Sequence, residues 1–161
     1  GGYRYNISGM IHGDKGVPNL APETIDYCIQ RINNKLKKYY DDIVMIEKME
    51  EEGSKIAVLA YGSTARPAKG ATKMAIESGI KVDFIRPITI WPFPEREIKE
   101  IACKVNKILV TEMNFEGQVA GLVRQTIEGE AEVVQLNKIS GLPFYVEEIY
   151  SQIIKINRGE K

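Results

Sequence analysis

The sequence has few of the residues that most often carry out chemistry in proteins. Its 161 residues include one histidine and two cysteines, and Cys28 and Cys103 stand far from each other and from any metal-ligand spacing. Two isolated cysteines do not form a disulfide framework in a chain of this length. We therefore expect reduced, mostly buried thiols, a cytoplasmic location, and no metal bound by this chain.

The sequence also lacks an excess of charge of either sign. Its 22 lysine and arginine residues balance 22 aspartate and glutamate residues, so the formal net charge is zero. Binding to nucleic acid and to anionic membrane surfaces depends on a basic excess. No apolar run approaches the roughly 18 residues that a membrane span requires. The sequence thus predicts neither a nucleic-acid partner nor a membrane partner.

Residues 1–42 are predicted to form a linker followed by a helical arm. Glycines and a proline interrupt residues 1–20, where only a short strand at 3–7 is expected. Pro22 begins a helix, because its missing N–H costs nothing in the first turn. Apolar residues then recur at alternating spacings of four and three up to about residue 41, which places them on one helix face. They are Ile25, Ile29, Ile32, Leu36 and Tyr39. We expect this face to pack on its own or a neighbouring domain.

From residue 43 onward, short apolar runs alternate with segments of helical periodicity. The expected strands are 43–46, 56–61, 82–85, 107–111 and 133–136, and the expected helices are 67–77, 94–105, 118–127 and 147–157. Strands joined by helices of this length form βαβ units around a parallel sheet. Right-handed crossovers place the helices on both faces of that sheet. Residues 43–161 are therefore predicted to form a three-layer α/β/α domain.

Ligands of such a sheet bind beyond the carboxyl ends of its strands. Three loops qualify, at 62–64, 86–89 and 112–118. None contains a nucleotide-binding fingerprint. In the first loop, Ser63 and Thr64 either cap the next helix or contact a ligand or partner. Arg66, which follows them, is either an ordinary exposed arginine or pairs with a carboxylate or phosphate.

The remaining candidates have equally open interpretations. Asn114 and Gln118 flank a strand-to-helix turn, and they either cap the helix or contact an interface or ligand. Trp91 and Phe93 lie among prolines, and they either cover the core of the domain or form a patch that faces a partner. His12 lies in the linker and is expected at the surface. No acid–base pair or Ser–His–Asp set can be assembled, so the residues alone predict no self-contained active site.

Four stretches carry a resemblance to a known family. They are LAYGST at 59–64, IRPITIWPFP at 85–94, VTEMNFEGQV at 110–119 and GLPF at 141–144. Together they resemble the C-terminal part of the alpha subunit of 2-oxoacid:ferredoxin oxidoreductases, especially the 2-oxoglutarate type. The linker, with GMIH at 9–12 and GVP at 16–18, is similar to the segment that precedes this part. The resemblance covers essentially the whole chain, and its second and third stretches are fairly specific.

The resemblance implies a fold and a reaction. The fold is a transketolase C-terminal-like domain with a five-stranded mixed sheet, whose edge strand, at 43–46, is antiparallel. The enzymes of the family decarboxylate a 2-oxoacid on thiamine diphosphate, held with magnesium. They pass electrons through iron–sulfur clusters to ferredoxin and form an acyl-coenzyme A. Their thiamine site is built by an upstream domain of the alpha subunit and by the beta subunit.

This chain departs from the family pattern in what it contains. It has neither the upstream thiamine-type domain nor a cysteine cluster for iron–sulfur. The chain alone is therefore expected to hold no cofactor, to be inactive, and to serve the assembly of the enzyme by packing against the upstream domain and the beta subunit. Its candidate interface or ligand-loop residues, none with a catalytic role, are His12, Ser63, Thr64, Arg66, Asn114 and Gln118.

Two other functions stay open at this point. The chain is either a free-standing α/β domain that binds an anionic small ligand at its strand ends, or the C-terminal domain of another thiamine enzyme. Transketolase and the branched-chain dehydrogenase beta subunit are examples of the second kind, because a shared fold does not settle function. The stretches at 85–94 and 110–119 favour the ferredoxin-linked family.

Overall fold

The computed structural model describes residues 8–160. The chain divides into two compact units, Gly1–Ile43 and Val44–Lys161. The strand expected at 3–7 lies outside the described residues. None of the described helices combines the length and the apolar character that a membrane span requires.

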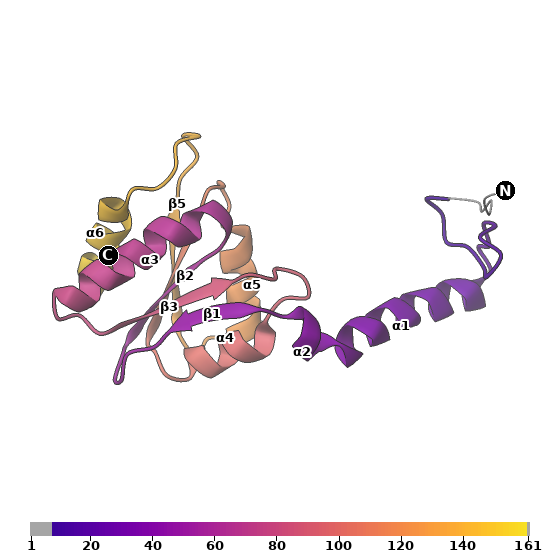
Figure 1. The fold of residues 1–161 in the computed structure, drawn as a ribbon, viewed down its shortest axis with the longest axis horizontal. Helices are drawn as coiled ribbons and strands as arrows, with labels where there is room; N and C mark the ends of the chain where they lie inside the picture. The colour runs from indigo at the N-terminus through magenta and orange to yellow at the C-terminus, as the bar shows by residue number, and fades with distance from the viewer. Residues whose placement is uncertain (1–7, 161) are drawn as a thin grey trace. The chain divides into compact units, whose positions relative to one another are not determined.

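The first unit contains two helices, α1 (Pro22–Lys38) and α2 (Tyr40–Ile43) (Figure 1). Helix α1 begins at Pro22 as expected, but it ends at Lys38 rather than near residue 41. Lys35, Lys37 and Lys38 occupy its last turn, where positive charge favours the carboxyl end of a helix. Helix α1 contains no buried residue, and the apolar side chains of Ile29 and Ile32 are exposed.

The second unit is a five-stranded sheet between two layers of helices. Its elements are β1 (Ile46–Met49), β2 (Ile56–Ala60), the short 3-10 helix η1 (Gly62–Thr64), α3 (Ala65–Glu77), β3 (Val82–Pro87), α4 (Glu95–Ala102), β4 (Lys107–Glu112), α5 (Gln118–Ile127), β5 (Glu132–Asn137) and α6 (Val146–Asn157). The strand order is β1-β3-β2-β4-β5, and only β1 runs antiparallel to its neighbour. This confirms the predicted α/β/α architecture with one antiparallel edge strand.

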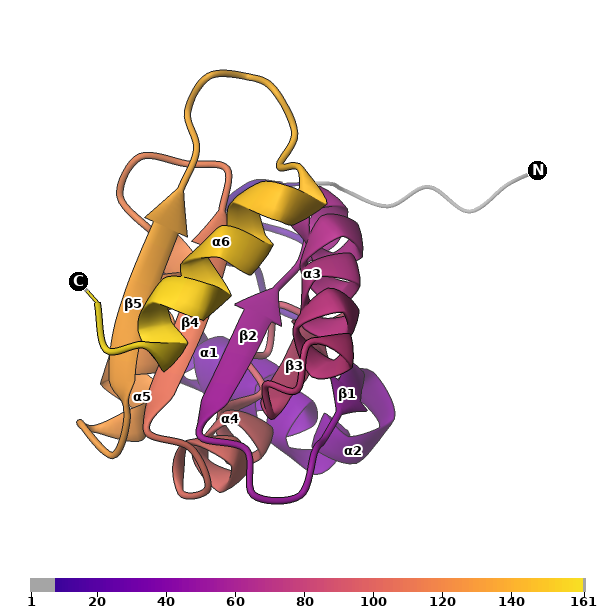
Figure 2. The same cartoon turned by 90° about the vertical axis from the view of Figure 1, so that its left-hand side faces the viewer.

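Each face of the sheet buries its own apolar core. Helices α3 and α6 cover one face and α4 and α5 cover the other (Figure 2). Strand β2 is central and wholly buried, so its residues alternate between the two cores: Val58 faces α3 and α6, and Leu59 faces α4 and α5. A strand covered on both faces is expected to read as a continuous apolar run. The face of α3 is built from small residues, which allow it to approach the sheet closely. They are Ala65, Ala68, Ala71 and Ala75.

The edge of the sheet corrects two predicted boundaries. The antiparallel strand is Ile46–Met49 and not 43–46, because Ile43 ends helix α2. Strand β3 continues through Pro87, which pairs with Ile46, so the loop after it begins later than 86. An edge strand is only partly covered and accepts polar residues and proline. Runs of apolar residues therefore predicted the position of the edge strand poorly.

The two cysteines correct another expectation. Both are free, but Cys28 is only partly buried and Cys103 is exposed. Cys103 follows the last turn of α4, and its thiol donates a hydrogen bond to Glu130 Oε2 at 3.0 Å. This hydrogen bond to a carboxylate raises the pKa of the Cys103 thiol above its ordinary value. The thiol is therefore accessible but held in its protonated, less nucleophilic form.

Candidate functional site

The candidate site is the carboxyl edge of β2 and β4. After β2 the chain passes to β3 on one side of that strand, and after β3 it passes to β4 on the other side. The strand order therefore reverses between β2 and β4, which is where open α/β sheets bind ligands. Helix η1 follows β2 there, and the loop 113–117 follows β4. These two segments contain three of the six predicted candidates, Ser63, Thr64 and Asn114, and Gln118 directly follows the second segment.

Glu112 anchors this edge. It is the last residue of β4, and its side chain is fully buried. Its carboxylate accepts hydrogen bonds from the backbone N–H groups of Val119 and Ala120, each at 2.9 Å. It also accepts from the Tyr61 hydroxyl at 3.2 Å and from the Asn114 amide at 2.9 Å. Glu112 therefore caps helix α5 with its charge and joins the ends of two strands.

The pKa of Tyr61 reflects this arrangement. Partial burial of the phenol raises its pKa above the ordinary value, and the neighbouring charge of Glu112 raises it further. The Tyr61 hydroxyl thus stays protonated and serves as a hydrogen-bond donor. With four donors on the Glu112 carboxylate, this pair holds the fold together and offers little to acid–base catalysis.

The loop that follows Glu112 has a fixed backbone. Three hydrogen bonds hold it, from Gly117 N to Asn114 Oδ1 at 2.6 Å, from Gln135 Nε2 to Glu116 O at 3.0 Å, and from Asn137 Nδ2 to Phe115 O at 2.8 Å. Gly117 adopts a φ of 75°, and a Cβ atom there would lie 1.8 Å from the Gln135 amide nitrogen. Only glycine fits this position. The loop therefore presents Phe115, whose side chain is 79% exposed, from a rigid base.

The roles of Ser63 and Thr64 differ from the capping interpretation, which is wrong for both. Neither side chain caps α3. Thr64 is buried, and its hydroxyl donates to Tyr61 O at 2.7 Å and lies 3.3 Å from Thr111 O. Ser63 is exposed, and its Oγ lies 3.8 Å from Met113 Sδ. These contacts bring η1 and the β4–α5 loop together.

The capping interpretation is also wrong for Asn114 and Gln118. Asn114 holds the turn before α5 through Gly117, and Gln118 is the exposed first residue of the helix. Glu112, a residue to which the sequence reasoning gave no role, caps α5 instead. Its position directly after a buried strand and before a turn into a helix was the signal available for it.

Arg66 and His12 take no part in these contacts. Arg66 is exposed in the first turn of α3 and lines a hollow that is described below. His12 belongs to the first unit, where it is exposed and its Nδ1 lies 3.1 Å from Gly13 O. It lines a hollow of about 460 Å³ with Tyr27 and Cys28.

Two further loops at the carboxyl ends of strands also combine a fixed base with an exposed apolar tip. After β3, Phe93 is buried and covers the core, whereas Trp91 is 74% exposed, and its contact with a partner stays a prediction. After β5, Lys138 Nζ donates to Pro143 O at 3.0 Å, while Leu142 is 56% exposed. The loops after β4 and β5 lie at the same end of the sheet (Figure 2).

In the described part of the chain, the candidate site is an exposed surface available for contact with a partner. Within residues 8–160, no three histidine, cysteine, aspartate or glutamate side chains are grouped to hold a metal ion. The carboxyl edge provides exposed polar groups, at Ser63 and Gln118, next to apolar tips at Phe115 and Met113. Such a mixture of aromatic and polar groups on a rigid base is typical of protein–protein interfaces.

Comparisons with known proteins identify a family. The family model for pyruvate:ferredoxin oxidoreductase core domain II matches residues 54–149. The chain is 36% identical, over 158 residues, to 2-oxoglutarate synthase subunit KorA of Methanothermobacter thermautotrophicus, a match that covers 98% of this chain and 42% of the relative. The chain therefore spans less than half the length of this relative.

Solved structures show the same likeness. The 2-oxoglutarate:ferredoxin oxidoreductase from Magnetococcus marinus, solved with 2-oxoglutarate, coenzyme A and succinyl-CoA bound, matches 94% of this chain and 26% of its own chain. The TM-score is 0.82 at 25% sequence identity. A split-gene transketolase matches 71% of this chain and 42% of its own, with a TM-score of 0.57 at 16% identity, which shows a shared fold alone.

Proposed function

The chain belongs to the pyruvate:ferredoxin oxidoreductase core domain II family, and from this premise we propose that it is part of the alpha subunit of a 2-oxoacid:ferredoxin oxidoreductase. The proposed reaction is the oxidative decarboxylation of a 2-oxoacid such as 2-oxoglutarate to an acyl-coenzyme A, with reduction of ferredoxin. The identity to a 2-oxoglutarate synthase subunit and the likeness to the Magnetococcus enzyme support this assignment. The two unpaired cysteines support a cytoplasmic location for the enzyme.

The cofactors of the proposed enzyme belong to other domains and subunits. Cys28 and Cys103 are the chain's two cysteines and lie in different units. Iron–sulfur clusters are held by several cysteine thiolates, so the residues of this chain do not fit such a cluster. Thiamine diphosphate, magnesium and the clusters are therefore proposed for the upstream domain and the beta subunit.

The proposed role of this chain is assembly. Residues 1–42 form a linker and helical arm, and residues 43–161 form the domain that packs against the upstream domain and the beta subunit. The observation that carries this role is the exposed Phe115 on a loop held by three hydrogen bonds. A pre-ordered aromatic side chain loses little conformational freedom when a partner covers it, which is why such residues dominate interfaces.

The other candidates fit the same role. Asn114 lies within the Phe115 loop, Ser63 and Gln118 lie beside it, and all three supply polar groups for the rim of an interface. Thr64 is buried next to Ser63, and its hydroxyl holds this segment in place through its contacts with Tyr61 O and Thr111 O. His12 is a candidate contact of the linker. Ferredoxin and coenzyme A are reached through the assembled enzyme.

The test is Phe115→Ala in the complete alpha subunit, purified with its partner subunits. We expect subunit association to weaken about tenfold or more, as measured by sedimentation at decreasing concentration. The 2-oxoacid-dependent dye reduction should fall in parallel, since it needs the assembled enzyme.

Glu116→Ala is the matched control, because Glu116 is an exposed neighbour in the same loop. It should leave association and activity unchanged. Unchanged association of Phe115→Ala would contradict the proposed role of this loop. Full 2-oxoacid oxidation by the 161-residue chain alone would contradict the proposal that this chain serves assembly while other domains and subunits hold the cofactors.

A further inference from the structure

A hollow of about 420 Å³ opens where the first half of α3 lies beside the edge strand β1 and its neighbour β3. Its volume falls within the range of small-molecule sites in proteins. Three basic residues reach it from α3, and one comes from β3. They are Arg66, Lys69, Lys73 and Arg86. Glu47 of β1 is the one acidic residue in its lining.

The fold itself brings these charges together. Arg66, Lys69 and Lys73 are spaced by three and four residues, so they share one face of α3. Arg86 stands directly opposite Glu47 in the antiparallel register of β3 and β1. The alternation along β1 turns Glu47 toward the α3 side of the sheet, where its neighbour two positions on, Met49, packs in the core with α3 and α6.

The single carboxylate does not balance the four cations. Glu47 accepts from Lys69, and its second oxygen lies 3.3 Å from Arg86 Nη1. These two bases lower the pKa of Glu47, with the hydrogen bond from Lys69 as the largest cause. Arg66 and Lys73 are exposed, and neither has a carboxylate partner within residues 8–160. The hollow therefore carries three excess positive charges in a chain whose net charge is zero.

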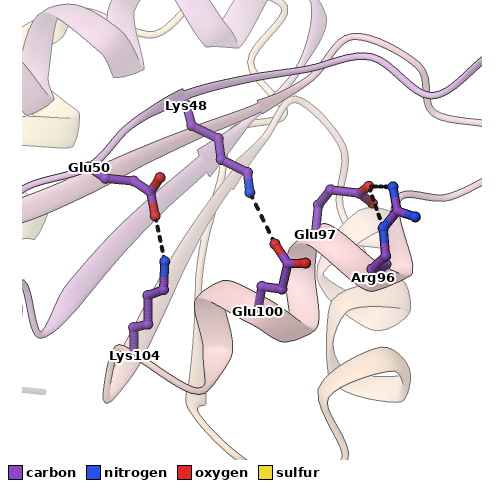
Figure 3. Close-up of polar contacts among 6 residues, drawn as sticks. All are labelled: Lys48, Glu50, Arg96, Glu97, Glu100 and Lys104. Carbon is purple, nitrogen blue, oxygen red and sulfur yellow. Dashed lines mark hydrogen bonds and ion pairs between the residues drawn. The ribbon is translucent and has the colours of Figure 1, made fainter. Parts of the chain in front are cut away.

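The other side of the same edge is balanced (Figure 3). There, three basic side chains each pair with a different carboxylate, and all six residues lie on β1 or α4 or just after them. The pairs are Lys48–Glu100 at 3.5 Å, Lys104–Glu50 at 2.8 Å and Arg96–Glu97 at 2.8 Å. The excess of positive charge is thus a local feature of the α3 side and does not reflect the general composition of this edge.

We propose that this hollow binds a small anion that carries a phosphate or diphosphate group. Two arginines and two lysines supply both the forked donors and the point charges that recognise phosphate oxygens. Like charges at this spacing destabilise a helix when nothing neutralises them. A phosphate dianion neutralises most of the excess, and a bound diphosphate neutralises nearly all of it. This site is separate from the Phe115 loop and does not depend on the assembly role.

The test is calorimetric titration of the chain with inorganic pyrophosphate at low ionic strength, where screening is weakest. We expect saturable binding that weakens as salt is added. The variant Arg66→Ala with Lys73→Ala should bind about tenfold more weakly, because it removes two charge-assisted contacts. Both residues are exposed, so thermal unfolding of this variant without anion should match the parent chain.

The matched control is Lys99→Ala with Lys155→Ala, which removes the same charge from exposed positions on α4 and α6. It should bind pyrophosphate as the parent chain does. An equal loss in the control pair would show general charge attraction and overturn the site. Succinate that binds as tightly as pyrophosphate would overturn the phosphate assignment. Absence of saturable pyrophosphate binding to the parent chain would overturn the proposal outright.

Discussion

Glu112 ends β4 and Phe115 lies three positions later in the loop that follows it, and the two residues have opposite relations to solvent. The Glu112 side chain is fully buried and accepts four hydrogen bonds, whereas Phe115 is 79% exposed. The same short segment therefore contains an anchor that holds the sheet to α5 and a tip that is largely exposed to solvent. The difference separates residues that stabilise the fold from residues available to a partner, and substitutions at each position test that separation.

The largest effect is expected for Glu112→Ala. It leaves two buried backbone N–H groups and the Tyr61 hydroxyl without their acceptor. The free energy of unfolding should fall by about 3–5 kcal/mol, because each buried donor left unsatisfied costs about 1–3 kcal/mol. Urea denaturation of the chain measures this loss.

Phe115→Ala gives the other half of the comparison in the same experiment. Its free energy of unfolding should stay within about 0.5 kcal/mol of the parent chain, because the side chain is exposed. A loss at Phe115 as large as the loss at Glu112 would remove the distinction between anchor and tip.

A smaller effect is expected for Gly117→Ala, which tests the rigidity of the base. The added Cβ atom would meet the Gln135 amide, and the φ of 75° disfavours any residue with a side chain. We expect a loss of about 1–3 kcal/mol in the free energy of unfolding.

Gly121→Ala is the matched control for Gly117, because Gly121 lies within α5 and has open space around it. There the same substitution should stabilise the chain by up to about 1 kcal/mol, since alanine favours a helix over glycine. Two glycines four residues apart should thus respond with opposite signs. Equal responses would mean that the loop is not fixed by Gly117.

The smallest effect is expected at the β5–α6 loop. Glu148 accepts hydrogen bonds from Lys138, at 2.7 and 2.8 Å, and from Tyr145 N at 2.7 Å. The hydrogen bond from Lys138 lowers the pKa of Glu148 below 4.5, and the bond from Tyr145 lowers it further. The stabilisation by Glu148 is therefore fully present above the ordinary glutamate pKa and is lost as the pH falls through the lower pKa of the folded chain.

Glu148→Gln should accordingly lower the Tm slightly at about pH 7 and have a smaller effect at about pH 3. Differential scanning calorimetry across this range measures the difference between the two chains. Glu147→Gln, at the exposed neighbouring position, should show no such dependence on pH. A difference at Glu148 that grows toward acid pH would contradict the role of its charge.

The buried layers of the fold could be predicted from the sequence, and its edge could not. Strand β2 reads as an unbroken apolar run because both of its faces are covered, and α5 shows a clear apolar face. Strand β1 is half exposed and contains Glu47 and Lys48, so its pattern resembles that of a turn. Only its pairing with β3 identifies it as a strand.

The candidate site shows the same limit. Ser63 and Asn114 lie after strand ends as predicted, but no side chain caps α3, and Glu112 supplies the cap on α5 that was considered for Asn114. A cap supplied by the end of the preceding strand depends on how strand and helix meet in space, and local propensity does not contain that information. Likewise, two aromatic residues among prolines, Trp91 and Phe93, look equivalent in the sequence and differ fully in burial.

The most direct test of the account is hydrogen exchange of this chain, measured alone and within the assembled alpha and beta subunits. We predict that amides of the loops at 113–117 and 139–142 exchange more slowly in the assembly, because partners cover their apolar tips. The surface of α4 around Lys99 should exchange at the same rate in both states. Unchanged exchange in both loops, with protection elsewhere on the domain, would contradict the claim that the carboxyl edge of the sheet is the assembly surface.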